Sequence, residues 1–170
     1  YPLLIYVYGG PNNQEVLNEW SSKSNLFFNF LAEQGYVVAC VDNRGSGGKG
    51  SEFKKSTFLN LGKFETEDQL LAAKYLGSLS FIDNNRIGIY GWSYGGFLAA
   101  NCLFEGNDIF KAAVAAAPVS NWNLYNDIYT ERYMRTPKEN PVGYNSFNPN
   151  VLAKNLKGNL LLLHGTSDDN

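Results

Sequence analysis

One serine flanked by glycines is the residue of this chain best suited to chemistry. Gly91-Trp92-Ser93-Tyr94-Gly95 fits the pattern Gly-x-Ser-x-Gly and follows the apolar run Arg86-Ile87-Gly88-Ile89-Tyr90. A helix-like stretch over residues 97–103 comes directly after it. Strand, sharp turn and helix together are typical of a nucleophile elbow, which exposes the serine hydroxyl above a sheet. The glycines suit such a turn because it leaves no room for β-carbons.

In that setting Ser93 is the candidate nucleophile, and the Tyr94 N–H points to where an oxyanion would form. A glycine-rich turn with an ordinary serine is the alternative for the motif alone. A serine hydroxyl needs a neighbouring base, normally His, which in turn needs a carboxylate to orient it. Asp168 and Asp169 follow the strand-like run Leu160–Leu163, where the acid is expected. A solvated turn is the alternative for this Asp-Asp pair.

His164 is the only histidine of the sequence, and it lies upstream of the acid at the end of the same run. In α/β-hydrolases the chain order is Ser, then Asp or Glu, then His, which argues against His164 as the base. We expect a structural histidine here, and the true base downstream of Asn170. On that expectation residues 1–170 hold nucleophile and acid without a complete triad, and are inactive alone.

Strand-like and helix-like segments alternate along the chain. Strands are expected at residues 3–8, 36–41, 86–90, 112–117 and 159–163, and helices at 24–34, 64–76, 97–103 and 151–156. Residues 119–149 show no clear period and are expected to form an excursion outside the sheet. This order predicts an α/β fold with a doubly wound, mostly parallel sheet, whose functional loops lie at the carboxyl ends of the strands.

In the first expected helix, Leu26, Phe27, Phe30 and Leu31 have the spacing of one apolar face. The second has Leu70, Leu71, Ala73 and Tyr75 among its apolar positions. The acidic residues in the first turn of the second helix, Glu65, Glu67 and Asp68, suit the positive end of a helix dipole.

Composition narrows the class of protein. The chain has 170 residues, 14 Lys and Arg against 16 Asp and Glu, and 44% hydrophobic residues, which favours one domain and gives no sign of a nucleic-acid partner. No membrane span and no signal peptide is visible in the sequence. No Cys or His cluster has metal-ligand spacing, and no metal or cofactor is expected. Cys40 and Cys102 are interpreted as small buried hydrophobes. Both ends fall beside strands, so we expect residues 1–170 to be an interior fragment of a longer protein.

Four blocks, in the same order, resemble the catalytic domain of the prolyl oligopeptidase family. They are Tyr1–Pro11 (Tyr-Pro-Leu-Leu-Ile-Tyr-Val-Tyr-Gly-Gly-Pro), the loop Asp42–Gly50, the motif Gly91–Gly96 and the segment His164–Asn170. Trp92, Tyr94 and the Asp-Asp-Asn end are most similar to the dipeptidyl peptidase IV branch. The resemblance spans essentially the whole chain. It implies an α/β-hydrolase fold lacking its C-terminal part, with an N-terminal β-propeller and the triad histidine outside residues 1–170.

The resemblance implies a serine peptidase that releases N-terminal dipeptides after Pro or Ala through an acyl-enzyme. Ser93 would be the nucleophile and Asp168 the acid, and the Tyr8 hydroxyl would join the Tyr94 N–H in the oxyanion hole. A proline pocket and a contact to a substrate carbonyl are also implied, with the residues Tyr94, Val119, Trp122, Tyr125, Tyr129 and, for the carbonyl, Asn170. From the residues alone, core packing or a lid is the alternative for the aromatics of 122–133.

Other activities stay open at this point. An acylaminoacyl peptidase, an oligopeptidase or an esterase could use the same fold, and a non-catalytic binding relative would typically lack the nucleophile. The expected partners are peptides with Pro or Ala near the N-terminus, and a homodimer of the full-length protein is left open. By resemblance the compartment is extracellular, periplasmic or membrane-anchored. Gly9 stands where the close relatives carry Ala.

Overall fold

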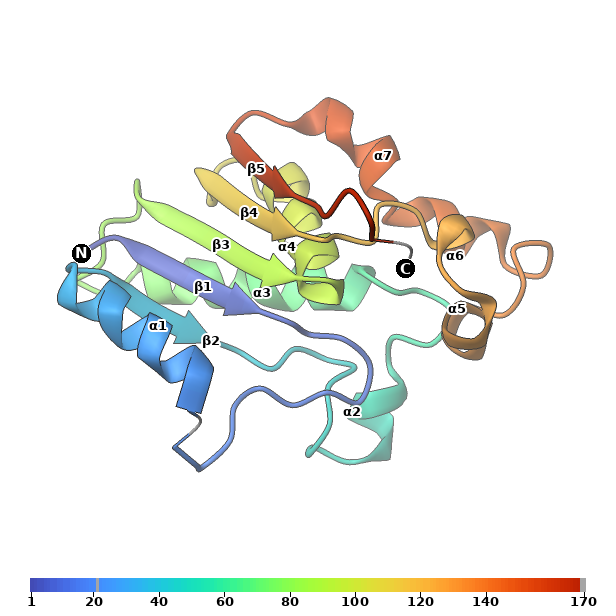
Figure 1. Ribbon diagram of the computed structural model, residues 1–170, viewed down its shortest axis with the longest axis horizontal. Coiled ribbons are helices and arrows are strands. Elements are labelled where there is room, and N and C mark those ends of the chain that lie inside the picture. Colours follow the sequence, from blue (N-terminus) through green and yellow to red (C-terminus); the bar gives the residue numbers. More distant parts are fainter. Residues whose placement is uncertain (21, 169–170) are drawn as a thin grey trace.

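The computed structural model describes residues 1–20 and 22–168, the side chains of 22–25 excepted. Within that part, five strands form one parallel sheet in the order β2-β1-β3-β4-β5 (Figure 1). The strands are β1 (Leu3–Val7), β2 (Val37–Cys40), β3 (Ile87–Trp92), β4 (Ala112–Ala116) and β5 (Asn159–Leu163). Each begins within one residue of the position predicted from the sequence, so the predicted parallel α/β architecture is confirmed.

Helices cover both faces of the sheet. Figure 1 shows α1 (Ser22–Glu33) in front of it, and α3 (Lys63–Gly77) and α4 (Tyr94–Glu105) behind it. The short α2 (Ser51–Lys55) lies beside the loops that follow β1 and β2, and it was not predicted from the sequence. The predicted helix at 151–156 is α7 (Pro149–Leu152) with a 3-10 turn, Ala153–Asn155, and it leads the chain into β5. The sheet is therefore doubly wound, as predicted.

The excursion between β4 and β5 is helical and lies beyond the carboxyl ends of the strands (Figure 1). It holds a 3-10 turn (Trp122–Leu124), α5 (Asp127–Met134) and α6 (Pro141–Ser146). Asparagines cap all three: Asn121 accepts from the N–H of Asn123, Asn126 from that of Tyr129, and Asn140 from that of Gly143. These helices are too short to show a hydrophobic period, so sequence periodicity could not predict them.

The predicted apolar face of α1 is mostly wrong. Leu26, Phe27 and Phe30 are 67%, 46% and 54% exposed, whereas Phe28 and Leu31 are half-buried. The sheet presents the ring of Tyr6 on this face, and the Phe28 ring packs on it with 5.1 Å between the centroids. Because these rings are large, α1 contacts the sheet through a narrow row of side chains and does not bury a wide apolar face.

The buried face of α3 is largely polar. Its buried residues are Glu65, Thr66, Gln69 and Ala73. Among the apolar positions noted in the sequence, Ala73 is buried and Leu70 partly buried, whereas Leu71 and Tyr75 are 62% and 68% exposed. Glu65, Gln69 and Ala73 follow an i, i+4, i+8 spacing, which places them on one side of the helix. The polar side chains on that side meet loops at the carboxyl ends of the strands, as described below.

The elbow forms where β3 passes into α4. Ser93 has φ 58° and ψ −115°, a left-handed backbone conformation that non-glycine residues rarely adopt. Its N–H donates to the Ala116 carbonyl of β4 at 2.8 Å, and its own carbonyl accepts from Phe97 at 3.0 Å. A β-carbon added at Gly91 would overlap the Gly95 carbonyl, and one added at Gly95 would overlap the Val7 carbonyl of β1. The tight crossing therefore requires glycine at both positions.

We expect Gly95→Ala to lower the free energy of unfolding by about 1–3 kcal/mol, because the new methyl group must displace the backbone of β1. Gly88→Ala, in the strand β3 that leads into the elbow, is the matched control. Its β-carbon would lie 3.5 Å from the Ala112 carbonyl oxygen and 3.6 Å from Leu4, which is ordinary contact. Urea unfolding of the full-length protein that contains this chain measures both variants. Equal losses in the two would contradict the steric argument.

Candidate active site

The loops after three neighbouring strands meet around one small cavity of about 80 Å³. Ser93 reaches it from β3, Val119 from the segment after β4, and Asp168 from the loop after β5. Tyr125 lines it as well. Carboxyl ends of parallel strands share one edge of a sheet, so residues far apart in sequence gather there. Four of the residues singled out from the sequence are therefore side by side.

Ser93 and Asp168 line the same cavity, but no described histidine side chain links them by hydrogen bonds. Across the described part of the chain, no hydrogen bond joins Ser93 Oγ to another side chain, and none joins His164 to Ser93. His164 is 53% exposed, and its Nε2 lies 3.6 Å from Asp168 Oδ2, which is beyond hydrogen-bond reach. The sequence prediction of a strand-end histidine beside the loops fits this position, and the role of His164 stays a prediction.

Two possible hydrogen-bond donors lie beside the elbow, each just after one of two adjacent strands, β1 and β3. Tyr94 is the first residue of α4, so its N–H has no carbonyl acceptor within the helix. Tyr8 directly follows β1, which pairs with β3 so that Val7 lies opposite Gly91. The Tyr8 and Tyr94 ring centroids are 6.3 Å apart. Burial raises the pKa of Tyr8, so its hydroxyl keeps a proton to donate at neutral pH.

The residues predicted for the proline pocket form one aromatic cluster beside this edge. The Trp122 ring is stacked on Tyr129 with 6.0 Å between centroids, and Tyr125 meets both edge-on at 5.7 and 5.4 Å. Tyr94 packs behind Trp122 at 5.4 Å. Tyr94 and Trp122 are closed to solvent, whereas Val119, Tyr125 and Tyr129 are half-buried. The cluster thus has a buried part that belongs to the core, Tyr94 and Trp122, and a half-buried part that solvent can reach.

The remaining sequence predictions concern Asn170, metal binding, membrane spans and the two cysteines. Asn170, predicted to bind a substrate carbonyl, lies outside the described residues. Residues 1–20 and 22–168 contain no group of three or more His, Cys, Asp or Glu side chains that could hold a metal ion. None of the helices described in this range is long and apolar enough to cross a membrane. Cys40 and Cys102 are free thiols, half-buried and buried respectively.

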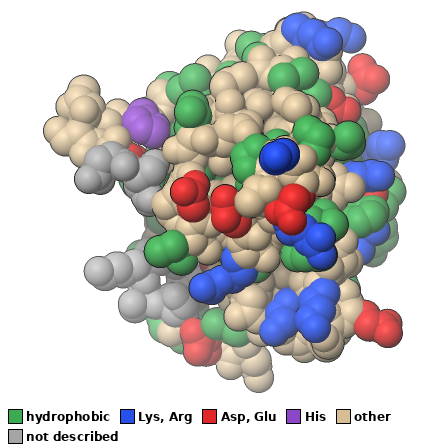
Figure 2. Space-filling model, turned by 90° about the vertical axis from the view of Figure 1, so that its right-hand side faces the viewer, with side chains coloured by type: hydrophobic (Ala, Val, Ile, Leu, Met, Phe, Trp, Pro, Cys, Tyr) green, Lys and Arg blue, Asp and Glu red, His purple; other side chains and the backbone are tan. Residues whose placement is uncertain are grey.

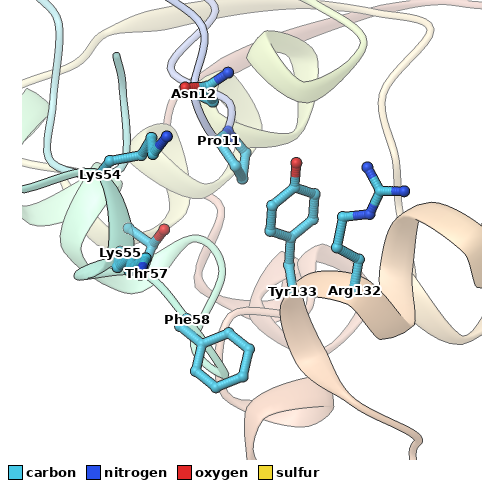
Figure 3. A pocket seen from close by; sticks show the side chains of 8 residues that line it. All are labelled: Pro11, Asn12, Lys54, Lys55, Thr57, Phe58, Arg132 and Tyr133. Carbon is cyan, nitrogen blue, oxygen red and sulfur yellow. The ribbon is translucent and has the colours of Figure 1, made fainter. Parts of the chain in front are cut away.

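A larger cavity of about 570 Å³ lies next to the aromatic cluster (Figure 3). Its lining residues are Pro11, Asn12, Lys54, Lys55, Thr57, Phe58, Arg132 and Tyr133. Tyr133 stands between Pro11 and Arg132 in Figure 3, and its ring lies 5.0 Å from that of Tyr129. Neither Ser93 nor Asp168 lines this cavity, so the groups that could do acyl chemistry belong to the smaller one.

Glu65 is a residue of the site that sequence reasoning missed. The Tyr94 hydroxyl donates to its Oε1 at 2.7 Å, and the Gly62 N–H donates to its Oε2 at 3.0 Å. Burial raises the pKa of Glu65 to about 7, although both hydrogen bonds favour the ionised form. The sequence feature that could have pointed to Glu65 is the spacing Gly62-x-x-Glu65, because a Glu three residues after a helix N-cap can accept a hydrogen bond from the N-cap N–H.

Figure 2 shows the side of the molecule toward which the strands point, the right-hand side of Figure 1, with the single histidine in purple; acidic and basic side chains stand beside one another there without a large area of one sign. This mixture accords with the small net charge of −2. It gives no electrostatic footprint for a nucleic-acid partner on that face.

The raised pKa of Glu65 predicts that stability falls as pH rises. Between its ordinary value of 4.5 and about 7, the folded state binds more protons than the unfolded state, so the free energy of unfolding decreases with pH. We expect Glu65→Gln to flatten this slope in urea unfolding followed across that range. Glu67→Gln, at a position 44% exposed on the same helix, is the control and should keep the slope. A wild-type slope in Glu65→Gln would contradict a buried, largely neutral carboxyl group.

Known proteins similar to this chain agree on its family. Residues 20–170 match the Prolyl oligopeptidase family. The chain is 44% identical over 173 residues to the probable dipeptidyl peptidase 4 of Emericella nidulans, and 43% identical over 172 residues to dipeptidyl aminopeptidase B of Saccharomyces cerevisiae. Both alignments cover the whole chain but only 22% and 21% of the respective relative. The chain thus spans about a fifth of the length of the curated relatives it matches.

Solved structures agree as well. The crystal structure of Porphyromonas gingivalis dipeptidyl peptidase 4 matches with a TM-score of 0.96 and 49% identity, covering 100% of this chain and 24% of that one. A putative dipeptidyl aminopeptidase IV from Bacteroides ovatus matches with a TM-score of 0.92 and 42% identity, covering 96% and 23%. The fold is therefore part of an α/β-hydrolase domain, and the resemblance inferred from the four sequence blocks is confirmed. This chain belongs to the prolyl oligopeptidase family.

Proposed function

We propose that this chain carries the nucleophile and the acid of a serine peptidase that releases N-terminal dipeptides after Pro or Ala. The observation that carries the proposal is the strained elbow at Ser93, which shares one cavity with Asp168, with Val119 and with Tyr125 of the aromatic cluster. The dipeptidyl peptidases among the relatives support peptides as the substrate class. The activity is proposed for the longer protein, of which this chain is the nucleophile-bearing part.

In the proposed reaction Ser93 Oγ attacks the substrate carbonyl carbon and gives its proton to a histidine base that Asp168 orients. We assign the base to a histidine beyond Asn170, because the chain order of this fold is Ser, Asp, His. The base passes the proton to the leaving amine as the peptide bond breaks and an acyl-enzyme forms. Water, deprotonated by the same base, then releases the dipeptide as a carboxylate. On this proposal residues 1–170 alone do not turn over substrate.

The developing oxyanion would accept hydrogen bonds from the Tyr94 N–H and the Tyr8 hydroxyl. Both stand at the amino end of α4, where the helix dipole also favours negative charge. Donors fixed in place before the reaction stabilise the transition state more than the ground state, by roughly 3 kcal/mol for one donor. Tyr8 is thereby proposed as a catalytic residue, and Tyr94 acts through its backbone.

Specificity for a small apolar residue would come from the aromatic cluster. A pyrrolidine ring is flat and apolar, so it can lie against aromatic faces that exclude water. The half-buried Tyr125 and Tyr129 offer those faces, with the buried Trp122 behind them, and the half-buried Val119 adds an aliphatic surface beside them. Larger side chains would have to displace rings that already contact one another, which favours Pro and Ala next to the scissile bond.

The proposal is tested with the full-length protein and a chromogenic Gly-Pro-anilide. We expect rapid release that Ser93→Ala reduces by at least about 10³-fold, and that Tyr8→Phe reduces in kcat by about 10²–10³-fold with little change in KM. Ser120→Ala, an exposed serine nearby, is the control and should leave the rate unchanged.

The other outcomes separate the alternatives. Ser93-dependent hydrolysis confined to esters or to N-terminally blocked peptides would contradict dipeptidyl specificity, and would favour an esterase or an acylaminoacyl peptidase. If no acyl substrate is hydrolysed in a Ser93-dependent way, the enzymatic proposal itself is wrong and a non-catalytic binding protein takes its place.

A further inference from the structure

We propose that the buried polar side of α3 positions both oxyanion donors, with Glu65 holding Tyr94 and Gln69 holding the loop of Tyr8 through Asn43. This inference rests on the proposed function, because it concerns how the donors of that reaction are held. Glu65 and Gln69 lie one helical turn apart and are fully buried, as Asn43 nearly is. Neither Glu65 nor Gln69 lines the cavity that holds Ser93, so both act as positioning residues.

The first contact holds the residue next to the nucleophile. The Tyr94 ring is 2% exposed and fixed at its far end, where its hydroxyl donates to Glu65 Oε1 at 2.7 Å. Along its length it packs on Phe97 and Trp122, with ring centroids 5.3 and 5.4 Å away. A ring anchored at its tip and packed on its sides leaves the Cα of Tyr94 little freedom. The direction of the Tyr94 N–H is then fixed as well.

The second contact holds the loop that follows β1. Gln69 Nε2 donates to the Val41 carbonyl at 2.8 Å and to Asn43 Oδ1 at 3.0 Å. Asn43 Nδ2 donates in turn to the Gly9 carbonyl at 3.0 Å and to the Arg44 carbonyl at 2.7 Å. Two amide side chains therefore link α3 to the residue directly after Tyr8. A shift of the Gln69 side chain would be transmitted to the Tyr8 loop through these bonds.

The two contacts lie on opposite sides of the loop after β1, and the loop is closely packed between them. Gly9 has φ 67°, and a β-carbon there would overlap Asn43 Oδ1. A β-carbon at Gly10 would lie 2.9 Å from Tyr8 Cε1 and 3.1 Å from Tyr94 Cγ. The loop is thus seated between the Asn43 amide on one side and the Tyr94 ring on the other. Moving either support would change the distance between the Tyr8 hydroxyl and the Tyr94 N–H.

The energetics of α3 also favour a positioning role. Among the side chains that the structure describes, no Lys or Arg bonds Glu65, whose two oxygens accept from a phenol and a backbone N–H. Within the described residues Gln69 Oε1 has no hydrogen-bond partner. Buried polar groups with such partners stabilise a fold less than apolar side chains of similar volume would. Their defined hydrogen-bond directions, which apolar side chains lack, are what the oxyanion donors require.

The test uses the full-length protein with Gly-Pro-anilide, and active sites counted by titration with a fluorophosphonate that labels Ser93. Glu65→Gln is informative because an amide can accept from only one of the two donors, and Gln69→Leu removes the link to Asn43. We expect each to lower kcat per titrated site by about tenfold or more, with KM within about twofold, since small misplacements of catalytic groups can cost up to 10²-fold. Affinity for a boronate that forms a tetrahedral adduct should fall by the same factor as kcat/KM.

Thr66→Val is the matched control. It removes a buried hydroxyl from the same helix without touching either contact, and should leave kcat per titrated site unchanged. A double-mutant cycle tests the route through Tyr94. Glu65→Gln should have no further effect in a Tyr94→Phe background, because the hydroxyl through which it acts is already gone. An undiminished loss of kcat in that background would overturn the Glu65 part of the inference.

Failure of the inference differs from failure of the proposed function. If Glu65→Gln and Gln69→Leu reduce only the melting temperature or the titratable fraction, with kcat per site and boronate affinity unchanged, α3 is merely structural and the inference is overturned. If the wild-type protein shows no Ser93-dependent hydrolysis, the proposed function fails first and the inference fails with it. Should either variant not fold, Tyr94→Phe and Asn43→Ala apply the same kcat and boronate tests to the partners in the two contacts.

Discussion

The carbonyl of Val7 in β1 lies so close to Gly95 that no side chain fits between the sheet and the start of α4. This approach lets the chain reverse sharply at Ser93, whose φ of 58° costs on the order of 1–3 kcal/mol. Hydrogen bonds to the Ala116 carbonyl and from the Phe97 N–H hold the conformation. The strain persists because strands on both sides and a buried helix fix the turn, and the same crossing brings the residue after β1 beside the elbow.

Beyond the elbow, the loop after β2 is bound to α3 by charges near the surface. The Arg44 guanidinium donates to both carboxylate oxygens of Asp68, at 2.7 to 3.0 Å, and reaches Glu67 at 3.2 Å. It also lies over the Phe64 ring, 4.4 Å from the centroid. Solvent screens part-buried ion pairs of this kind, so they contribute modest energy, but the bidentate geometry fixes the direction of the Arg44 side chain. Arg44 thereby holds the backbone from which Asn43 reaches inward, so outer charges and inner amides act on one loop.

The sequence predicted what depends on periodicity and on order along the chain. Strand runs of branched apolar residues, and the glycines around Ser93, predicted the sheet and the elbow because they reflect local backbone requirements. Glu65 and Gln69 could not be found in this way. Periodicity favours apolar positions for the buried side of a helix, and α3 buries polar residues whose partners lie more than 20 residues away. Nor could it show that Leu26 and Phe30 are exposed, since the sheet face beneath α1 is defined only after folding.

Tyr94 connects the parts of the site that sequence reasoning treated separately. Its N–H stands at the proposed oxyanion site, its ring supports Trp122 in the aromatic cluster, and its hydroxyl bonds Glu65. In the proposed reaction, a substrate ring against the half-buried Tyr125 would press through the buried Trp122 on Tyr94, the residue whose N–H is proposed to face the reacting carbonyl. Binding energy from the proline side chain could then be used in the transition state, where it raises kcat and not only affinity. Recognition and catalysis would be linked through this one side chain, because close-packed rings transmit displacement.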